Sequence, residues 1–405
     1  MKPFRERKRL ILKPIIFVIL LFCCIFALLF TTGDRVTANA EEQISEDAMK
    51  ELEGNIEELL NSLDLKELQN YLDSLSEFNG ISVKDKLKSV ITGDFALDYT
   101  SLGKSIIALV WDEMTVLLPA FAVILAISLL CGILNSAKNG FLNSTMTDII
   151  EFVGFIAVGA VVLSCVISVL SSGFSAIAQM KKQMEIVYPI LLTLMAASGG
   201  AVSAAIYRPA VTFMSGAIAE LFMAVVLPSA VVVIVLAFVG NLSSDYKTDK
   251  LSALFKSVSK WLVGLTLGLF SIFLSVQGIA AAQYDGLSLR AAKYAISSSV
   301  PIVGGFLSGG VDVVLAGSAL IKNALGSFSI FILFGTILRP LLLFAAFQIF
   351  LRLSAAATEP IGGKTSAFLS RLAGDMGYFI AALLSIAFLY FLTLLLLICS
   401  SGVIF

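Results

Sequence analysis

Residues 378–401 read YFIAALLSIAFLYFLTLLLLICSS and contain no charged side chain. A helix needs about 20 apolar residues to cross the hydrocarbon core of a bilayer, so this stretch predicts a membrane-spanning helix. Further apolar stretches of similar length cover residues 114–134, 149–170, 187–207, 210–240, 261–282 and 328–350. The sequence therefore predicts an all-α fold: a polytopic helical membrane protein with about seven spans in residues 105–405.

The composition of the whole chain supports this class. Hydrophobic residues make up 58% of the 405 residues and charged residues 14%, whereas soluble domains contain about 25% charged residues. A lipid bilayer is therefore the expected surroundings, and a net charge of -1 argues against a nucleic-acid partner. The chain has no histidine, which excludes imidazole bases and histidine-ligated metals. With no phosphate-binding loop either, we expect no enzyme activity, cofactor or metal.

The first forty residues have the layout of an export signal. A basic start is followed by an apolar stretch at 15–30, and Ala38 and Ala40 flank Asn39 as a small-x-small cleavage site. The pattern predicts a signal peptide at 1–40. Because the apolar stretch is longer than usual, an uncleaved anchor remains the alternative.

Residues 41–104 form a separate acidic segment with 15 Asp and Glu against 6 Lys, a net charge of -9. Leucine and isoleucine recur there at helical spacing, in two stripes made of Leu52, Ile56, Leu59, Leu60 and Leu63, then Leu65, Leu68, Leu72 and Leu75. A third, weaker helix is expected at 82–92. The pattern predicts a small extracytoplasmic helical domain that folds against the membrane body or a partner.

Two stretches do not read as simple spans. Residues 241–260 alternate lysines with apolar side chains, which is typical of a helix lying on the membrane surface. Residues 283–327 are rich in glycine, and an eighth span, a re-entrant segment and two broken half-helices all fit them. Seven crossings from an external start place lysine-containing loops outside, against the positive-inside tendency, so the loop orientation is left open.

Charged residues at membrane depth are the candidate functional residues. Glu220 lies within 210–240 and Arg339 within 328–350, while Asp312 lies in the glycine-rich stretch. Such groups are costly in hydrocarbon and usually face the interior of a bundle. They line a polar pathway in one interpretation and pair structurally in the other. Arg208, at the junction of two spans, fits a water interface.

Proline and glycine mark candidate helix breaks. One series contains Pro189, Gly199, Gly200 and then Arg208 before a proline. A second contains Pro301, Gly304, Gly305, Gly309 and Gly310, then Arg339 followed by Pro340. A further kink or break is expected at Pro228. Paired interrupted helices are typical of repeat-built transporters, but the spacings differ, and small residues also serve close helix packing.

The stretch YPILLTLMAASGGAVSAAIYRPAVTFMSG, residues 188–216, resembles the core of the stage III sporulation protein AE family. The layout of signal, acidic helical segment and polytopic body is similar to that family over essentially the whole chain. The family pattern contains no catalytic motif, so the resemblance implies no catalytic residue.

The resemblance implies a sporulation-specific membrane protein. Its expected place is the mother-cell-derived membrane around the forespore, with residues 41–104 between the two membranes. There it acts as a platform or conduit in a secretion-like channel complex, together with sibling stage III sporulation membrane proteins. Whether copies of the chain associate is left open. The alternative is a self-sufficient transporter for a small solute or ion, with Glu220 as its coupling carboxylate.

Overall fold

The fold comes from a computed structural model that describes residues 54, 56–75, 78, 80–92, 99–136, 144–242, 248–273, 304–360 and 363–400. Within these ranges the regular structure is helical and contains no strand. The all-α prediction is confirmed. The expected cleavage site at Ala38 and Ala40, and the candidate break at Pro301, lie outside the described residues.

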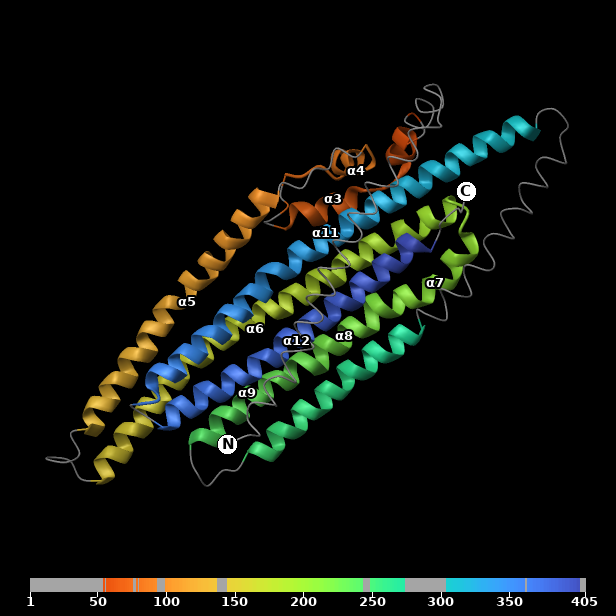
Figure 1. Cartoon of the computed structure of the whole chain (residues 1–405). Helices are drawn as coiled ribbons and strands as arrows, with labels where there is room; N and C mark the ends of the chain where they lie inside the picture. Colours follow the sequence, from red (N-terminus) through yellow and green to blue (C-terminus); the bar gives the residue numbers. More distant parts are fainter. Residues whose placement is uncertain are drawn as a thin grey trace.

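Long helices lie side by side in one elongated bundle (Figure 1). The helices are α3 (Lys66–Asp73), α4 (Val83–Ile91), α5 (Tyr99–Ser136), α6 (Ser144–Ala197), α7 (Ala201–Phe213), α8 (Ala219–Leu221), α9 (Leu227–Leu242), α11 (Gly304–Thr358) and α12 (Gly363–Cys399), with π-helical turns at Met214–Ile218 and Phe222–Val226. A further helix, Asp249–Phe273, follows α9. In the described part, six helical segments are long and apolar enough to cross a membrane.

Helix α6 differs most from the predicted spans. This helix is continuous for 54 residues. It contains the predicted span 149–170, the polar residues that follow this span, and Pro189. The predicted span 187–207 is instead divided at Ser198–Gly200, where Gly199 has φ +91°. A left-handed residue after a helix is normally glycine, because glycine has no Cβ to clash. The chain turns there and returns along the bundle as α7 (Figure 1).

The path from Ala201 to Leu242 stays helical, so Pro228 does not break it. The π-helical turn Phe222–Val226 lies directly before this proline. A wider turn changes the hydrogen-bond register locally, which accommodates a residue that has no backbone N–H. Of the predicted kink or break, a break is thus contradicted, and the helix changes type locally instead.

Helix α11 corrects two further predictions. It is continuous for 55 residues and contains Gly304, Gly305, Gly309, Gly310 and Pro340. From residue 304 onward the glycine-rich stretch is thus neither re-entrant nor broken. Several glycines of this bundle permit close packing instead; a Cβ at Gly326 would lie 2.3 Å from Ile398 Cγ1 on α12. At 1.5 Å per residue, α6 and α11 are each about 80 Å long, against a hydrocarbon core of about 30 Å.

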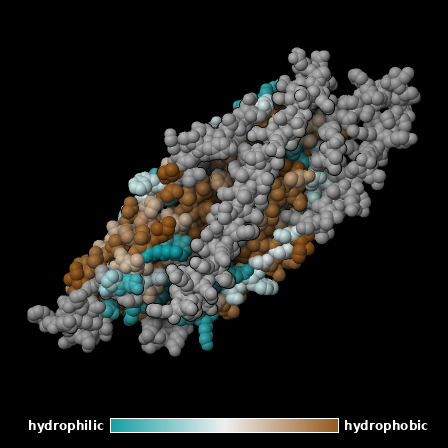
Figure 2. Space-filling view, in the orientation of Figure 1, coloured by the Kyte–Doolittle hydropathy of each residue, from teal (hydrophilic) through white to brown (hydrophobic). Residues whose placement is uncertain are grey.

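The helix Asp249–Phe273 exposes large apolar side chains and buries two serines. Many of its large apolar side chains are exposed and recur at helical spacing: Leu251, Leu254, Val258, Trp261, Leu265, Leu269 and Ile272. Exposed charged residues, Asp249, Lys250 and Lys260, lie in its first half. Its serines 252 and 259 are buried instead. Of the predicted surface helix at 241–260, residues 249–260 are the first part of a longer helix whose outer face suits lipid, whereas 241 and 242 end α9 and 243–247 lie outside the described residues. Brown, hydrophobic surface is also visible elsewhere on the bundle in Figure 2.

The acidic segment packs along α11, with α3 and α4 beside it (Figure 1). Most described members of its two stripes are covered by the chain itself: Ile56, Leu60, Leu65, Leu68, Leu72 and Leu75 are all at most 8% exposed. Leu59 and Leu63 are partly buried, and Leu52 lies outside the described residues. Phe78 lies against Gly335 and makes an edge-on contact with Phe331, the ring centroids being 5.7 Å apart. The buried members of the stripes are therefore not free to bind another protein, whereas charged side chains such as Glu57, Glu67 and Asp73 face outward.

Candidate functional site

A groove lined by hydroxyl groups lies between α5, α6 and α11. Its cavity measures about 590 Å³. The polar lining from α6 recurs at helical spacing and comprises Ser164, Ser168, Ser172, Ser175 and Gln179. Because residues three and four apart share a helix face, the sequence places these five side chains in one row. Membrane helices are mostly apolar, so a polar row in this cavity is the feature of the bundle best suited to contact water or a polar solute.

An ion pair forms one wall of this serine groove. Arg339 of α11 donates from Nε to Oε1 of Glu113 on α5, at 2.9 Å. The Glu113 side chain is 8% exposed and that of Arg339 is 56% exposed. The carboxylate is thus held inside, while the guanidinium lies at the open side of the groove. The pair is neutral overall, which lowers the cost of placing both charges among apolar helices.

The acidic domain closes the groove at one end. Ser74 and Leu75, which follow α3, belong to its lining. Nearby, the Tyr71 hydroxyl donates to the carbonyl oxygen of Gln179 at 3.1 Å, and the ring of Tyr71 is 1% exposed. A segment predicted to lie outside the membrane body therefore contributes directly to the site.

Glu220 and Arg339 do not meet. Glu220 accepts from Lys181 Nζ of α6 at 2.5 Å, and its side chain is 58% exposed. It is not part of the groove that contains Arg339. These two candidates thus form separate ion pairs with other helices. The arrangement is the one expected from structural pairing rather than from a shared pathway.

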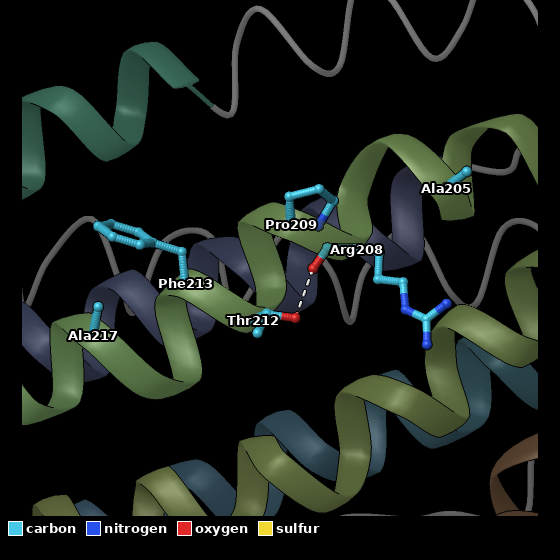
Figure 3. Close-up of a pocket in the computed structure, with 6 residues that line it drawn as sticks. All are labelled: Ala205, Arg208, Pro209, Thr212, Phe213 and Ala217. Atoms are coloured by element: carbon cyan, nitrogen blue, oxygen red, sulfur yellow. Dashed lines mark hydrogen bonds between the residues drawn. The ribbon is translucent and has the colours of Figure 1, made fainter.

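Arg208 and Asp312 lie apart from the groove. Arg208 is exposed on α7 and lines an open, mainly apolar depression of about 560 Å³ with Pro209, Thr212 and Phe213 (Figure 3). The Thr212 hydroxyl already donates to the Arg208 carbonyl at 3.0 Å. Asp312 is placed only by its position in α11. Arg208 therefore adds no polar group to the serine groove.

Two partners were missed by reasoning from sequence. Glu113 precedes the predicted span 114–134 by one residue, so it was not among the charged residues within predicted spans. Lys181 belonged to a stretch read as a loop, because its neighbours are polar. A carboxylate at the edge of an apolar run was the available signal for Glu113. No local signal pairs Lys181 with Glu220, 39 positions away.

Comparisons with known proteins agree on one family. The family model of stage III sporulation protein AE matches residues 81–402. Stage III sporulation protein AE of Bacillus subtilis (strain 168) is 26% identical over 365 residues, which are 89% of this chain and 91% of the relative. No solved structure matches the chain. The family is one of sporulation membrane proteins and not a known class of enzyme. This chain therefore belongs to the stage III sporulation protein AE family.

Proposed function

We propose that this chain is an integral component of the channel complex that connects mother cell and forespore, with the serine groove as a polar wall of the conduit. The groove is the observation that carries the proposal. It combines a row of hydroxyls, an interior carboxylate paired with an arginine, and an opening toward the outside of the single chain. A second membrane protein or a second copy placed over that opening would enclose a polar passage.

The proposed location follows from the family and from the acidic segment. The chain would lie in the mother-cell-derived membrane around the forespore, with residues 41–104 in the space between the membranes. Sibling stage III sporulation proteins are the proposed partners. Since the leucine stripes are covered, the outward face would do the docking, through exposed acids such as Glu57, Glu58, Glu67 and Asp73. Such a surface favours a basic partner and steers its approach.

The alternative of a self-sufficient transporter has weaker support. It assigned proton or ion coupling to Glu220, which requires a protected carboxylate. The Glu220 side chain is more than half exposed and already paired with Lys181. It also lies outside the serine groove.

The experiment replaces serines of one helix that differ only in the face they occupy. In a spore-forming host lacking its own copy, we expect Ser168→Leu and Ser172→Leu to reduce heat-resistant spores, because both would fill the groove. Ser171→Leu is the matched control, since Ser171 is exposed and outside the lining. Immunoblots of membranes must show equal amounts of all three variants. Normal spore counts for both groove variants at normal protein levels would refute the proposal.

A further inference from the structure

Helix α6 exposes different kinds of side chain in its two halves. Its exposed large apolar side chains all lie in the first half: Ile149, Phe152, Val153, Ile156 and Ile167. From Ser168 to Ala197 every residue of the helix is described, and the exposed side chains are serine, alanine, proline, threonine and the charged Lys182 and Glu185. Large apolar residues of this second half, such as Met184 and Leu191, are fully buried. The outside of the first half therefore suits lipid, whereas the outside of the second half suits water.

Helix α5, which packs beside α6, shows a similar boundary. Its exposed apolar side chains run from Val116 to Ile133, and no charged residue occurs between them. Asp112 is exposed one turn before Val116, next to Trp111, which is 68% exposed. Tryptophan is typical of the level where lipid headgroups meet water. Beyond it lies one exposed apolar residue, Ile107, and single apolar residues are common on water-facing surfaces.

The two apolar ranges lie at the same depth and have the length of a bilayer core. Cys131, near the end of the α5 range, packs on Gly154, near the start of the α6 range. Val116–Ile133 covers 17 positions and Ile149–Ile167 covers 18. At 1.5 Å per residue these are about 26 Å and about 27 Å, close to a hydrocarbon core of about 30 Å. Glu151 lies near the far end of the α6 range, from which its carboxylate reaches the opposite bilayer surface.

The arginines of α11 agree with this depth. Arg339 is 56% exposed and pairs with Glu113, the neighbour of Asp112 on α5. Arg352 is exposed 13 positions later, and Ile349, 50% exposed, lies between the two arginines. Thirteen positions are about 20 Å, and the arginine stems extend this distance toward both surfaces. An exposed guanidinium is costly in hydrocarbon, whereas at the headgroup level it binds lipid phosphates.

We propose that the lipid headgroups of one leaflet contact the bundle at the level of Trp111, Asp112 and Arg339. The part of α6 after Ile167 then stands outside the hydrocarbon core, on the face that α6 forms with α5 and α11. Figure 2 shows brown, hydrophobic surface over α5, and in Figure 1 this helix runs away from α3 and α4. The partner of the lower surface is thus the acyl-chain layer, and the partner of the three boundary residues is the phosphate layer.

This placement gives the acidic domain a position beside the bilayer surface. The Tyr71 hydroxyl bonds to the carbonyl of Gln179, which belongs to the second half of α6. The serine groove crosses the boundary, with Ser164 at the level of the acyl chains and Ser175 on the water side. Residues 187–197 of α6 stand above the membrane on this face, although hydropathy alone predicts 187–207 as a span.

The bilayer surface is inclined to the bundle axis. In Figure 1 the helix Asp249–Phe273 and α5 lie on opposite sides of the bundle. Ser259 of this helix bonds with Ser229, and Glu220, the partner of Lys181, lies nine positions before Ser229 on an antiparallel path. Ile272, 13 positions after Ser259 and 64% exposed, therefore lies near the level of Lys181. Acyl chains extend further along that side than along α6.

The test compares two alanines on one face of α6. Ala160 and Ala178 are both exposed and are 18 positions apart, which is five turns, so they point in the same direction. Each is replaced by cysteine in a full chain whose native cysteines are alanine. The purified variants are reconstituted alone into liposomes of phosphatidylcholine and phosphatidylglycerol and labelled with a nitroxide. Electron paramagnetic resonance then measures collisions with oxygen, which concentrates among acyl chains, and with nickel ethylenediaminediacetate, which stays in water on both sides.

We expect frequent oxygen collisions and few nickel collisions for Ala160→Cys. Ala178→Cys should show a nickel collision rate several-fold higher than Ala160→Cys. Thr193→Cys should behave like Ala178→Cys, because Thr193 is exposed, although it lies inside the span that hydropathy predicts.

Each other result would overturn the proposal. Oxygen-rich signals at positions 178 and 193 would place the second half of α6 in the bilayer. Nickel collisions at position 160 would place the first half in water, and low rates with both reagents there would show that protein covers it. If a variant does not elute as a single species, Phe152→Cys replaces Ala160→Cys and Glu185→Cys replaces Ala178→Cys, with the same expectations. The inference does not depend on the conduit proposal, because the measurement needs neither partners nor sporulation.

Discussion

The docking of the acidic domain on α11 can be tested at one aromatic residue, Phe78. Its ring is 5% exposed, lies on Gly335 and meets Phe331 edge-on. Replacing a buried phenylalanine by alanine costs about 3–5 kcal/mol, which includes an aromatic pair worth roughly 1 kcal/mol. We take about 3 kcal/mol as the loss for Phe78→Ala, since the contact lies at the edge of the domain. The docked state should then be disfavoured about a hundredfold.

The assay is a disulfide cross-link across the same interface. A Cβ at position 317 would lie 3.3 Å from Leu59 Cδ1. Replacing Leu59 and Gly317 by cysteine therefore brings two thiols close enough to form a disulfide, because cysteine at position 59 is shorter than leucine. The native cysteines are replaced by alanine first. We expect rapid oxidation to the cross-linked form in membranes, and markedly slower oxidation after Phe78→Ala.

The matched control is Phe213→Ala. Phe213 is 58% exposed on α7, far from the acidic domain in the sequence and not part of its interface with α11. It should leave the oxidation rate unchanged. An equal rate in the Phe78→Ala variant would show that this ring does not hold the domain, and the assigned interface would be wrong.

Three further outcomes follow from ion pairs and close packing. Arg339→Met leaves the Glu113 carboxylate inside without its partner and should cost about 2–3 kcal/mol, seen as a lower melting temperature in detergent that Glu113→Gln largely restores. A melting temperature equal to that of the natural chain would contradict the pairing. Glu220→Gln should cost under about 1 kcal/mol and leave spore counts normal, because exposed pairs contribute little; loss of spores at normal protein level would favour the transporter instead. Gly326→Val should prevent α11 and α12 from packing and reduce the folded fraction in size-exclusion profiles, whereas Ile398→Ala in the same chain should relieve the clash. Failure of that second change to help would refute the contact.

The fold class was predictable from hydropathy, but the lengths of the helices were not. The polar residues between 171 and 186 suggested a loop, whereas α6 continues through them. Their partners lie on other helices: the Gln183 side chain donates to the Ser329 carbonyl at 2.7 Å, and Lys181 pairs with Glu220. Hydropathy scores each residue by its transfer from water and does not include such partners.

Helical periodicity correctly predicted which leucines of the acidic domain are buried. It did not predict whether the membrane body or a partner covers them. Leu68 and Leu72 are fully buried by the chain itself, so they are unavailable to a partner protein. For the groove, Ser164, Ser168 and Ser172 recur at helical spacing in the sequence, which predicts one helix face but not the helices that enclose it. Glu113 is paired across 226 positions, and no local pattern encodes a contact of that range.

Helix α11 spans far more than a bilayer, and this has a mechanical consequence. The acidic domain contacts α11 at Gly317 and Gly335, while α12 contacts it from Gly326 to Gln348, whose side chain donates to the Ala373 carbonyl at 2.9 Å. An unbroken rod of about 80 Å turns an angular change into a displacement, and a tilt of about 5° at one end moves the other by roughly 7 Å. A ligand or lipid that shifts the α11–α12 contact at Gln348 would thus displace the part of the acidic domain that lies on Gly317, with no change in the helix itself.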